Sequence, residues 1–289
     1  MLHHNGNILH LPDGRLFTVL YGKFDGGERL NNFAVASDDG GFSWHYLSTV
    51  ADASAAPGAP EGPNESAVQL LDNGDLLCIY RVSGSWDFHK SYSRDGGQTW
   101  SQAERMEGIW SVQPRLARLR NGTLVLTGGR PGLFCYLCSD GKGEVWERVN
   151  LGAHHNTLID DQDQRFSAAF CRAENGEDPA MSTSYTSVMP LGAAAMIVTY
   201  DRLANGWSEA PAPMARSAAS SAWFCRCLFK SASRLDQRSW KAFYNSRASC
   251  HSPQAAAPAR CPPRSRPEES KCEPESATQN SISTLTAWA

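Results

Sequence analysis

The sequence lacks a long apolar run and a surplus of charge of either sign. No stretch approaches the roughly 20 consecutive apolar residues that a membrane-spanning helix needs, so we expect no transmembrane helix. Across 289 residues, 27 Lys and Arg stand against 30 Asp and Glu, which leaves a formal net charge of -3. This balance gives no electrostatic reason to expect nucleic acid or an anionic membrane as a partner.

The start of the chain lacks the marks of a secretory leader. Residues 1–7 contain neither a basic segment nor an apolar core. Taken literally, this absence predicts a cytoplasmic protein, although a chain whose true leader is missing would read in the same way.

The cysteines lack a recognisable disulfide or metal-binding pattern. There are nine, an odd number, and a chain of this length needs no covalent staples to build a core. Cys135 and Cys138 form a nominal C-x-x-C, but they lie in an apolar, strand-like run whose alternation places them on opposite faces. We therefore expect buried structural thiols and not a metal or redox role for these cysteines. For the chain as a whole we expect no metal and no organic cofactor.

The sequence does contain a repeated polar turn that a tryptophan closes. Residues 37–44 and 93–100 both read Ser-x-Asp-Gly-Gly-x-(Ser/Thr)-Trp, and residues 139–146 form a weaker copy with Gly at the aspartate position and Val at the hydroxyl position. Asp and Ser hydrogen-bond nearby backbone N–H groups, Gly supplies positive φ, and Trp anchors the next strand. Copies 56 and 46 residues apart indicate an array of small sheets. The positions assigned to this structural turn are Ser37, Asp39, Gly41, Trp44, Ser93, Asp95, Gly97, Trp100 and Trp146.

A strand, a tight turn and a second strand precede each copy, which is a strong hairpin signal. An Asn-Gly or Asp-Gly turn closes the first three hairpins, and a fourth hairpin within 185–207 has Leu-Gly-Ala-Ala instead. Each unit supplies about four short strands, the content of one propeller blade. The sequence therefore predicts an all-β domain over residues 1–210, with units near 1–50, 63–105, 111–150 and 181–210.

Two segments carry less pattern. Residues 147–180 read as exposed loops around a short apolar stretch, and we expect an insertion between two units. His154 and His155 lie there, and adjacent histidines in a polar loop are more often solvated than bound to a metal. Residues 211–289 are rich in Ala, Ser, Pro, Arg and Cys and predict a low-complexity, disordered tail, in which 222–229 is apolar enough to form a strand.

The repeated turn resembles the Asp box of the sialidase superfamily, whose members fold as six-bladed β-propellers. The resemblance covers roughly residues 8–210 and implies a sialidase-like β-propeller of four-stranded blades that is incomplete in this chain. In that family the box is a structural element of the blade periphery, so it implies a fold and not an activity.

Other segments resemble the site of the same family. Residues 64–70 followed by Tyr80 and Arg81 are similar to the segment in which a glutamate opens a strand pair that ends on a substrate-binding arginine. Residues 128–133 resemble the place of another such arginine, and residues 184–188 are similar to the segment that holds the nucleophilic tyrosine. The resemblance implies these roles: Tyr185 is the nucleophile, Glu65 its general base, and Arg81 and Arg130 bind the substrate carboxylate.

These residue types suit the chemistry of a sialic acid, which carries a carboxylate on its anomeric carbon. Arginine grips a carboxylate through bidentate, charge-assisted hydrogen bonds that lysine reproduces poorly. A carboxylate nucleophile would be repelled by the same anion, whereas a neutral tyrosine deprotonated by a neighbouring glutamate avoids the repulsion.

The sequence departs from the family at two places. Sialidases open with an Arg-Ile-Pro segment that supplies the first arginine of the carboxylate site, whereas residues 3–7 contain no arginine. The acid/base aspartate is matched loosely by Asp25, with Glu28 as the alternative.

The leading expectation is an exo-sialidase-type glycoside hydrolase that removes a terminal sialic or related acidic sugar from a glycoconjugate. The alternative is a catalytically inactive propeller that binds glycans or a protein partner. An arginine in the place of the missing one would separate the two, because an active enzyme should have it. The sequence leaves the oligomeric state open.

Overall fold

The computed structural model describes residues 2–24, 26–55, 57–82, 87–172 and 185–202, together with the backbone of 221–228 and 241–243. The chain divides into two compact units, Met1–Ser249 and Cys250–Ala289, and every described residue belongs to the first. Asp25, the predicted acid/base residue, lies outside the described residues.

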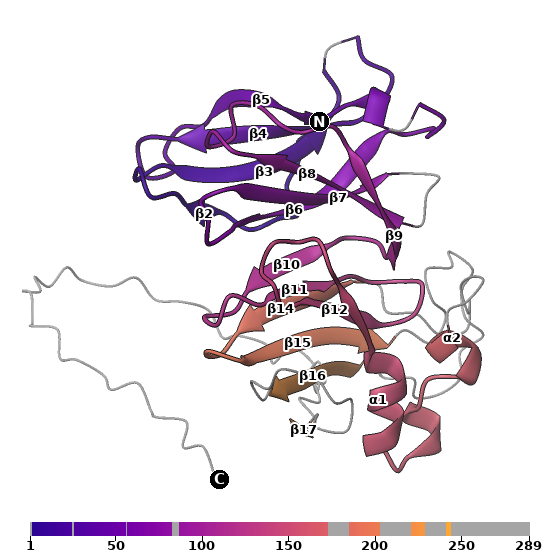
Figure 1. Ribbon diagram of the computed structural model, residues 1–289. Coiled ribbons are helices and arrows are strands. Elements are labelled where there is room, and N and C mark those ends of the chain that lie inside the picture. Colours follow the sequence, from indigo (N-terminus) through magenta and orange to yellow (C-terminus); the bar gives the residue numbers. More distant parts are fainter. Residues whose placement is uncertain are drawn as a thin grey trace, which may run out of the picture. The chain divides into compact units, whose positions relative to one another are not determined.

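The described strands form antiparallel sheets in sequence order (Figure 1). The first sheet contains β1 (Leu2–His3), β2 (Leu9–His10), β3 (Leu16–Gly22), β4 (Asn31–Ser37) and β5 (His45–Ala51). The second contains β6 (Pro63–Leu70), β7 (Leu76–Val82), β8 (Asp87–Ser93) and β9 (Glu104–Trp110). The third contains β10 (Arg115–Arg118), β11 (Leu124–Thr127), β12 (Phe134–Cys138) and β13 (Glu147–Asn150). The fourth contains β14 (Thr186–Pro190), β15 (Ala195–Arg202), β16 (Ser221–Leu228) and β17 (Lys241–Phe243).

The tight turns that the sequence predicts close the first hairpin of each of the first three sheets. Gly14, Gly74 and Gly122 have φ of 93°, 89° and 87°, a conformation that glycine adopts at no steric cost. Each donates its N–H to the carbonyl three residues earlier, at 3.0 Å. The all-β prediction and its four-stranded units are confirmed at this level.

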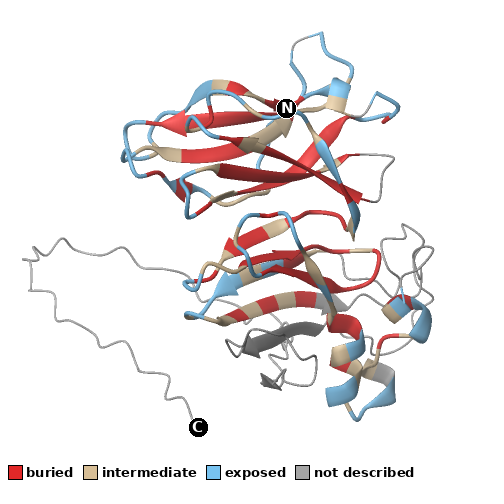
Figure 2. Cartoon of the chain, viewed as in Figure 1, coloured by how far each residue is buried: buried red, intermediate tan, exposed pale blue. Residues whose placement is uncertain are grey.

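Strands β7 and β8 of the second sheet and β11 and β12 of the third are buried on both faces (Figure 2). Along β7, Leu76 and Tyr80 join a core cluster shared with Phe17 of β3, whereas Leu77 and Ile79 join a cluster shared with β11 and β12. Strands covered on both sides read as continuous apolar runs, and β7 and β12 do so. Cys135 and Cys138 are buried and belong to different clusters, so the prediction of buried cysteines on opposite faces is confirmed.

The segment between the third and fourth sheets is helical where loops were expected. It contains α1 (Leu151–Leu158), the 3-10 turn η2 (Gln162–Gln164) and α2 (Ala168–Arg172); a further 3-10 turn, η1 (Ala53–Ala55), follows β5. The expectation of solvated histidines is wrong for His155, which is fully buried and contacts the Tyr200 hydroxyl and the Gln164 carbonyl, each at 3.0 Å. Two hydrogen bonds offset the cost of burying the imidazole. Among the described helices, none has the length and apolar character needed to cross a membrane.

The fourth sheet extends beyond the predicted end of the folded domain at residue 210. Strand β16 pairs with β15 over eight residues and β17 pairs with β16, so two of its four strands come from the segment predicted to be a tail. The apolar stretch 222–229 is the part of that segment that the sequence marked as able to form a strand, and it corresponds to β16.

The repeated turns are built as a closed set of hydrogen bonds. In the second turn, Ser93 Oγ donates to Asp95 and accepts from the Gly97 N–H, each at 2.8 Å. The other oxygen of Asp95 accepts from the Thr99 hydroxyl, and this bond is the main cause that lowers the pKa of Asp95 to about 2. The first turn repeats these contacts. The aspartate therefore works as a fixed acceptor within the turn.

The third turn begins one residue earlier than expected, at Cys138 and not at Ser139. Cys138 Sγ donates to Asp140 at 2.8 Å and accepts from the Gly143 N–H at 3.2 Å, which are the two bonds that the serine makes in the second turn. The assignment of glycine to the aspartate position is therefore wrong. A cysteine replaces the serine, Asp140 is the aspartate, and one additional residue precedes Trp146.

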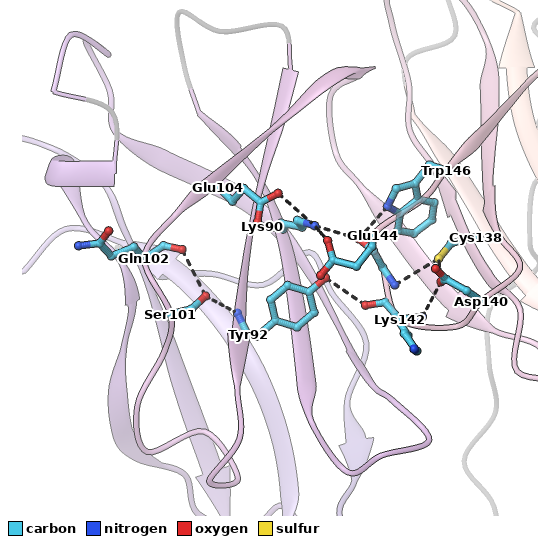
Figure 3. A network of polar contacts seen from close by, with 11 residues as sticks. Lys90, Tyr92, Ser101, Gln102, Glu104, Cys138, Asp140, Lys142, Glu144 and Trp146 are labelled. Atoms are coloured by element: carbon cyan, nitrogen blue, oxygen red, sulfur yellow. Dashed lines mark hydrogen bonds and ion pairs between the residues drawn. The ribbon is translucent and has the colours of Figure 1, made fainter.

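The third turn is also tied to the second sheet (Figure 3). The Lys90 ammonium of β8 is buried, with 3% of its side chain exposed, and it lies 2.6 Å from a carboxylate oxygen of Glu144. It donates to the Gly143 carbonyl at 3.2 Å and lies 3.3 Å from Glu104 of β9. A turn of one sheet thus supplies the counter-charge for a buried cation of the preceding sheet.

Candidate functional site

The predicted base, Glu65, lies at the start of the second sheet and is 7% exposed. Because Ser66 pairs with Tyr80, Glu65 lies at the end of the hairpin at which Arg81 lies, next to a register shift between Pro63 and Ser66. Oε2 of Glu65 is 3.5 Å from Nη1 of Arg81. The same oxygen accepts the backbone N–H of Gln113 at 2.8 Å. The carboxylate is therefore held between the second sheet and the segment that leads into the third.

The predicted arginine and tyrosine of the third and fourth sheets contact each other. The guanidinium carbon of Arg130 lies 5.7 Å from the ring centroid of Tyr185, within the range of a cation–π interaction. Tyr185 immediately precedes β14, which is bound to the third sheet because the Thr186 hydroxyl donates to that of Thr127 at 3.0 Å. Arg130 and Tyr185 are thus positioned by neighbouring sheets.

A third arginine, which the sequence analysis missed, joins these elements. Arg115 opens β10, and its Nε donates to the Thr186 carbonyl at 3.4 Å. Burial lowers the pKa of Arg115, and the Glu65 carboxylate opposes this shift. Burial lowers the pKa of His4, and the positive charge of Arg115 lowers it further. Arg115 therefore lies within electrostatic reach of both Glu65 and the first strand.

A second phenol, also missed, comes from the first sheet. Tyr21 of β3 stacks on His3 with ring centroids 4.9 Å apart, and the Asn5 side chain hydrogen-bonds its hydroxyl. Burial raises the pKa of Tyr21, and the charge of Glu65 raises it further, with smaller effects from Tyr185 and Arg81. The phenol is therefore neutral over the physiological pH range and lies among the predicted site residues.

The structure thus brings Glu65, Arg81, Arg130 and Tyr185 into one network of contacts. Their chemical roles stay predictions. The repeat gives a positional signal in the sequence: Asn5, Glu65 and Gln113 each stand nine residues before the positive-φ glycine of their own hairpin turn, and the missed Tyr21 stands seven residues after its glycine, as Arg81 does after Gly74. Because the hairpins repeat, equivalent positions carry polar groups to the same end of successive sheets.

Within the part of the chain that the structure describes, the network contains three guanidinium groups. That of Arg81 lies 3.5 Å from the Glu65 carboxylate, that of Arg115 is within electrostatic reach of it, and that of Arg130 lies on the Tyr185 ring. Such an arrangement favours an anionic ligand, although the whole chain is slightly acidic. Two cavities lie elsewhere, one of about 440 Å³ beside Asp52 and Gln102 and one of about 640 Å³ beside Arg165 and α2. Neither is lined by a residue of the network.

Comparison with solved structures gives matches of low sequence identity, of which the first supports the fold. A protein of unknown function from Dyadobacter fermentans aligns with a TM-score of 0.53 and 19% identity over 70% of this chain and 50% of its own. The Hadza microbial sialidase Hz136 aligns with a TM-score of 0.48 and 15% identity, over 71% of this chain and 36% of its own. The α-L-arabinofuranosidase of Fusarium graminearum gives a TM-score of 0.47 and 18% identity, over 76% and 60%. This chain therefore spans between about a third and three fifths of the length of these proteins.

Sequence comparison identifies the family. A search of curated proteins gives no match. The sequence profile of the BNR repeat-like domain matches residues 3–190, which include the three repeated turns and the four described residues of the predicted site. On this match, the chain belongs to the BNR repeat-like domain family, within the sialidase-like superfamily.

Proposed function

We propose that this chain binds the carboxylate of a terminal acidic sugar at the network around Glu65 and hydrolyses its glycosidic bond, in the manner of an exo-α-sialidase. The sheets are, in this proposal, blades of a sialidase-like propeller whose family has six. The glycoconjugate that carries the sugar is the partner, and sialic acid is the first candidate because its carboxylate adjoins the reacting carbon.

The observation that carries the proposal is that Arg81 and Arg115 both act on the Glu65 carboxylate, while Arg130 lies on the ring of Tyr185. Three arginines suit an anion with two acceptor oxygens, because planar guanidinium groups bind carboxylates in pairs of hydrogen bonds. Arg115 supplies a third cation where residues 3–7 contain no arginine. In the proposal it acts in place of the first arginine of the family pattern.

Glu65, Tyr185 and Asp25 carry out the proposed reaction. Glu65 takes the proton of Tyr185, and the phenolate oxygen attacks the anomeric carbon and displaces the glycosidic oxygen, which gives a covalent tyrosyl intermediate; this displacement and the hydrolysis that follows give net retention of configuration. Water then releases the sugar. Asp25, outside the described residues, would protonate the leaving oxygen.

A fluorogenic α-sialoside tests the proposal, with the corresponding β-galactoside as a substrate that lacks the carboxylate. We expect turnover of the sialoside alone at some pH between about 4 and 8. Tyr185→Phe should lower kcat by at least about a hundredfold, because it removes the attacking oxygen. Arg115→Lys should raise KM, because lysine keeps the charge and loses the paired hydrogen bonds.

Binding without turnover would favour the other candidate, a catalytically inactive glycan-binding propeller. The absence of arginine from residues 3–7 is the observation that favours it. Titration with free N-acetylneuraminic acid by calorimetry separates the two cases. Failure of both binding and turnover would refute the proposed anion site.

A further inference from the structure

The short segment Ser111–Gln113 joins two parts of the network that belong to different sheets. Its backbone exchanges two hydrogen bonds with the Arg130 loop: Gly129 N–H donates to the Val112 carbonyl at 2.9 Å, and Val112 N–H donates to the Arg130 carbonyl at 3.1 Å. The Ser111 hydroxyl donates to the Gly129 carbonyl at 2.7 Å. At its other end the Gln113 N–H donates to Glu65, as described above.

The backbone of this segment is held in an unusual conformation. Gln113 has φ of 48°, and it is the only non-glycine residue with positive φ in the part of the chain that the structure describes. Residues with a Cβ rarely adopt this region, and such strain persists where the surrounding structure imposes it. On the opposite side Gly128 touches Ser111 so closely that a Cβ at residue 128 would overlap the serine side chain. Both features fix the path of the backbone on either side of the Gln113 N–H.

We propose that Ser111–Gln113 is a positioning clip and that Gln113 is a positioning residue for Glu65. The clip holds the Glu65 carboxylate at a fixed distance from the Arg130 loop. In the proposed reaction, Glu65 accepts the proton of Tyr185 and Arg130 binds the substrate. Both contacts of Glu65 engage Oε2, and the clip thereby orients Oε1 for proton transfer. This inference rests on the proposed function of the site. In it the backbone N–H of Gln113 positions Glu65, and the glutamine side chain does not.

Three substitutions at residue 113 separate the backbone from the side chain. Gln113→Gly and Gln113→Asn accept positive φ, whereas Gln113→Val disfavours it because its side chain is branched at Cβ. In the sialoside assay we expect Gly and Asn to retain kcat within about threefold of the wild type. Gln113→Val should lower kcat by at least about thirtyfold, because it displaces the base Glu65. It should change KM by less than about threefold, because the arginines that bind the substrate stay in place. Equal losses in Gly and Val would overturn the proposal, since the side chain would then be what matters.

A second measurement tests the clip without any catalytic activity. In the amide proton–nitrogen NMR spectrum of the whole chain, the Gln113 amide proton should resonate downfield because a carboxylate accepts it. Glu65→Gln replaces the charged acceptor with a neutral one and should move this signal upfield, and Gln113→Gly should keep a downfield amide at residue 113. An unmoved signal in Glu65→Gln would refute the clip. If instead the signal moves and the wild type hydrolyses no sialoside, the clip stands and the proposed function fails.

Discussion

Gly97 of the second repeated turn lies against the ring of Phe17 in the first sheet, so closely that a methyl group at residue 97 would overlap that ring. The same turn is fastened to β5, because Trp100 Nε1 donates to the Ser48 hydroxyl at 3.0 Å and that hydroxyl donates to the Gly97 carbonyl. In the third turn, Gly143 similarly approaches the Leu77 side chain of the second sheet. Each of these two turns therefore docks on the preceding sheet.

Replacement of Gly97 by alanine should destabilise the protein strongly. Its φ of 93° disfavours a Cβ, and the methyl group meets Phe17. Together these effects should lower the free energy of unfolding by about 2 to 4 kcal/mol, measured by urea denaturation. Gly74→Ala is the matched control, because its φ is 89° with no atom within 4 Å of the added Cβ, and it should cost about 1 to 2 kcal/mol. Equal costs would mean that the turn does not pack on Phe17.

Cys138 should be replaceable by serine and not by valine. Serine can make both bonds of the thiol, to Asp140 and to the Gly143 N–H, as serine does in the other two turns. We expect Cys138→Ser to change the free energy of unfolding by less than about 1 kcal/mol. Cys138→Val has a similar size and leaves a buried N–H without its acceptor, so it should cost about 1 to 3 kcal/mol. Equal stability of the two variants in urea would contradict the assigned register.

Mutations of Lys90 and of its two partners, Glu104 and Glu144, should have unequal effects on stability. Lys90 is 3% exposed at its side chain, whereas Glu104 and Glu144 are 62% and 53% exposed. The double variant Glu104→Gln/Glu144→Gln leaves a buried ammonium without a counter-charge and should cost about 3 kcal/mol. Lys90→Met leaves only solvated carboxylates and should cost less than about 1 kcal/mol.

The triple variant, with Met at residue 90 and Gln at residues 104 and 144, provides the control for this prediction. It should recover most of the stability that the double variant loses, because no buried charge remains. Urea denaturation of the four proteins completes the cycle. A triple variant as unstable as the double variant would show that the lost stability does not come from the buried ammonium.

The turn aspartates should make stability depend on pH in the acidic range. Hydrogen bonds, first from the Thr99 hydroxyl, lower the pKa of Asp95 in the folded protein to about 2 from an ordinary 3.8. A carboxylate with a lowered folded pKa contributes stability that is fully present above its unfolded pKa and is lost as the pH falls through the folded value. The contribution of Asp95 should therefore decline between about pH 4 and pH 2.

Asp95→Asn tests this pH dependence directly. The difference in unfolding midpoint between wild type and Asp95→Asn should be constant above about pH 5 and should shrink as the pH falls toward 2. Thr99→Val, which removes the leading donor, should show the same trend with smaller amplitude. A difference that stays constant down to pH 2 would contradict the assigned role of the carboxylate.

Much of the fold could be predicted because its signals are local. The positive-φ glycines at residues 14, 74 and 122 mark hairpin turns whose side chains and backbone act within a few residues, and their spacing separates the sheets. Helix α1 was not predicted because it is only eight residues long and is stabilised by contacts with β15, such as that of His155 with Tyr200. Cys138 escaped because a thiol replacing a serine is visible only once its two hydrogen bonds are seen.

The sequence by itself determined the hairpins and the repeated turns, because a periodic pattern carries its own register, and its resemblance to the sialidase family supplied the candidates Glu65, Arg81, Arg130 and Tyr185. Only the tertiary structure decided which polar groups meet. Arg115, Tyr21 and the Gln113 N–H reach the network because separate sheets place their strand ends side by side. That placement depends on the packing of one sheet on the next, through contacts such as Gly97 with Phe17, and no local pattern encodes it.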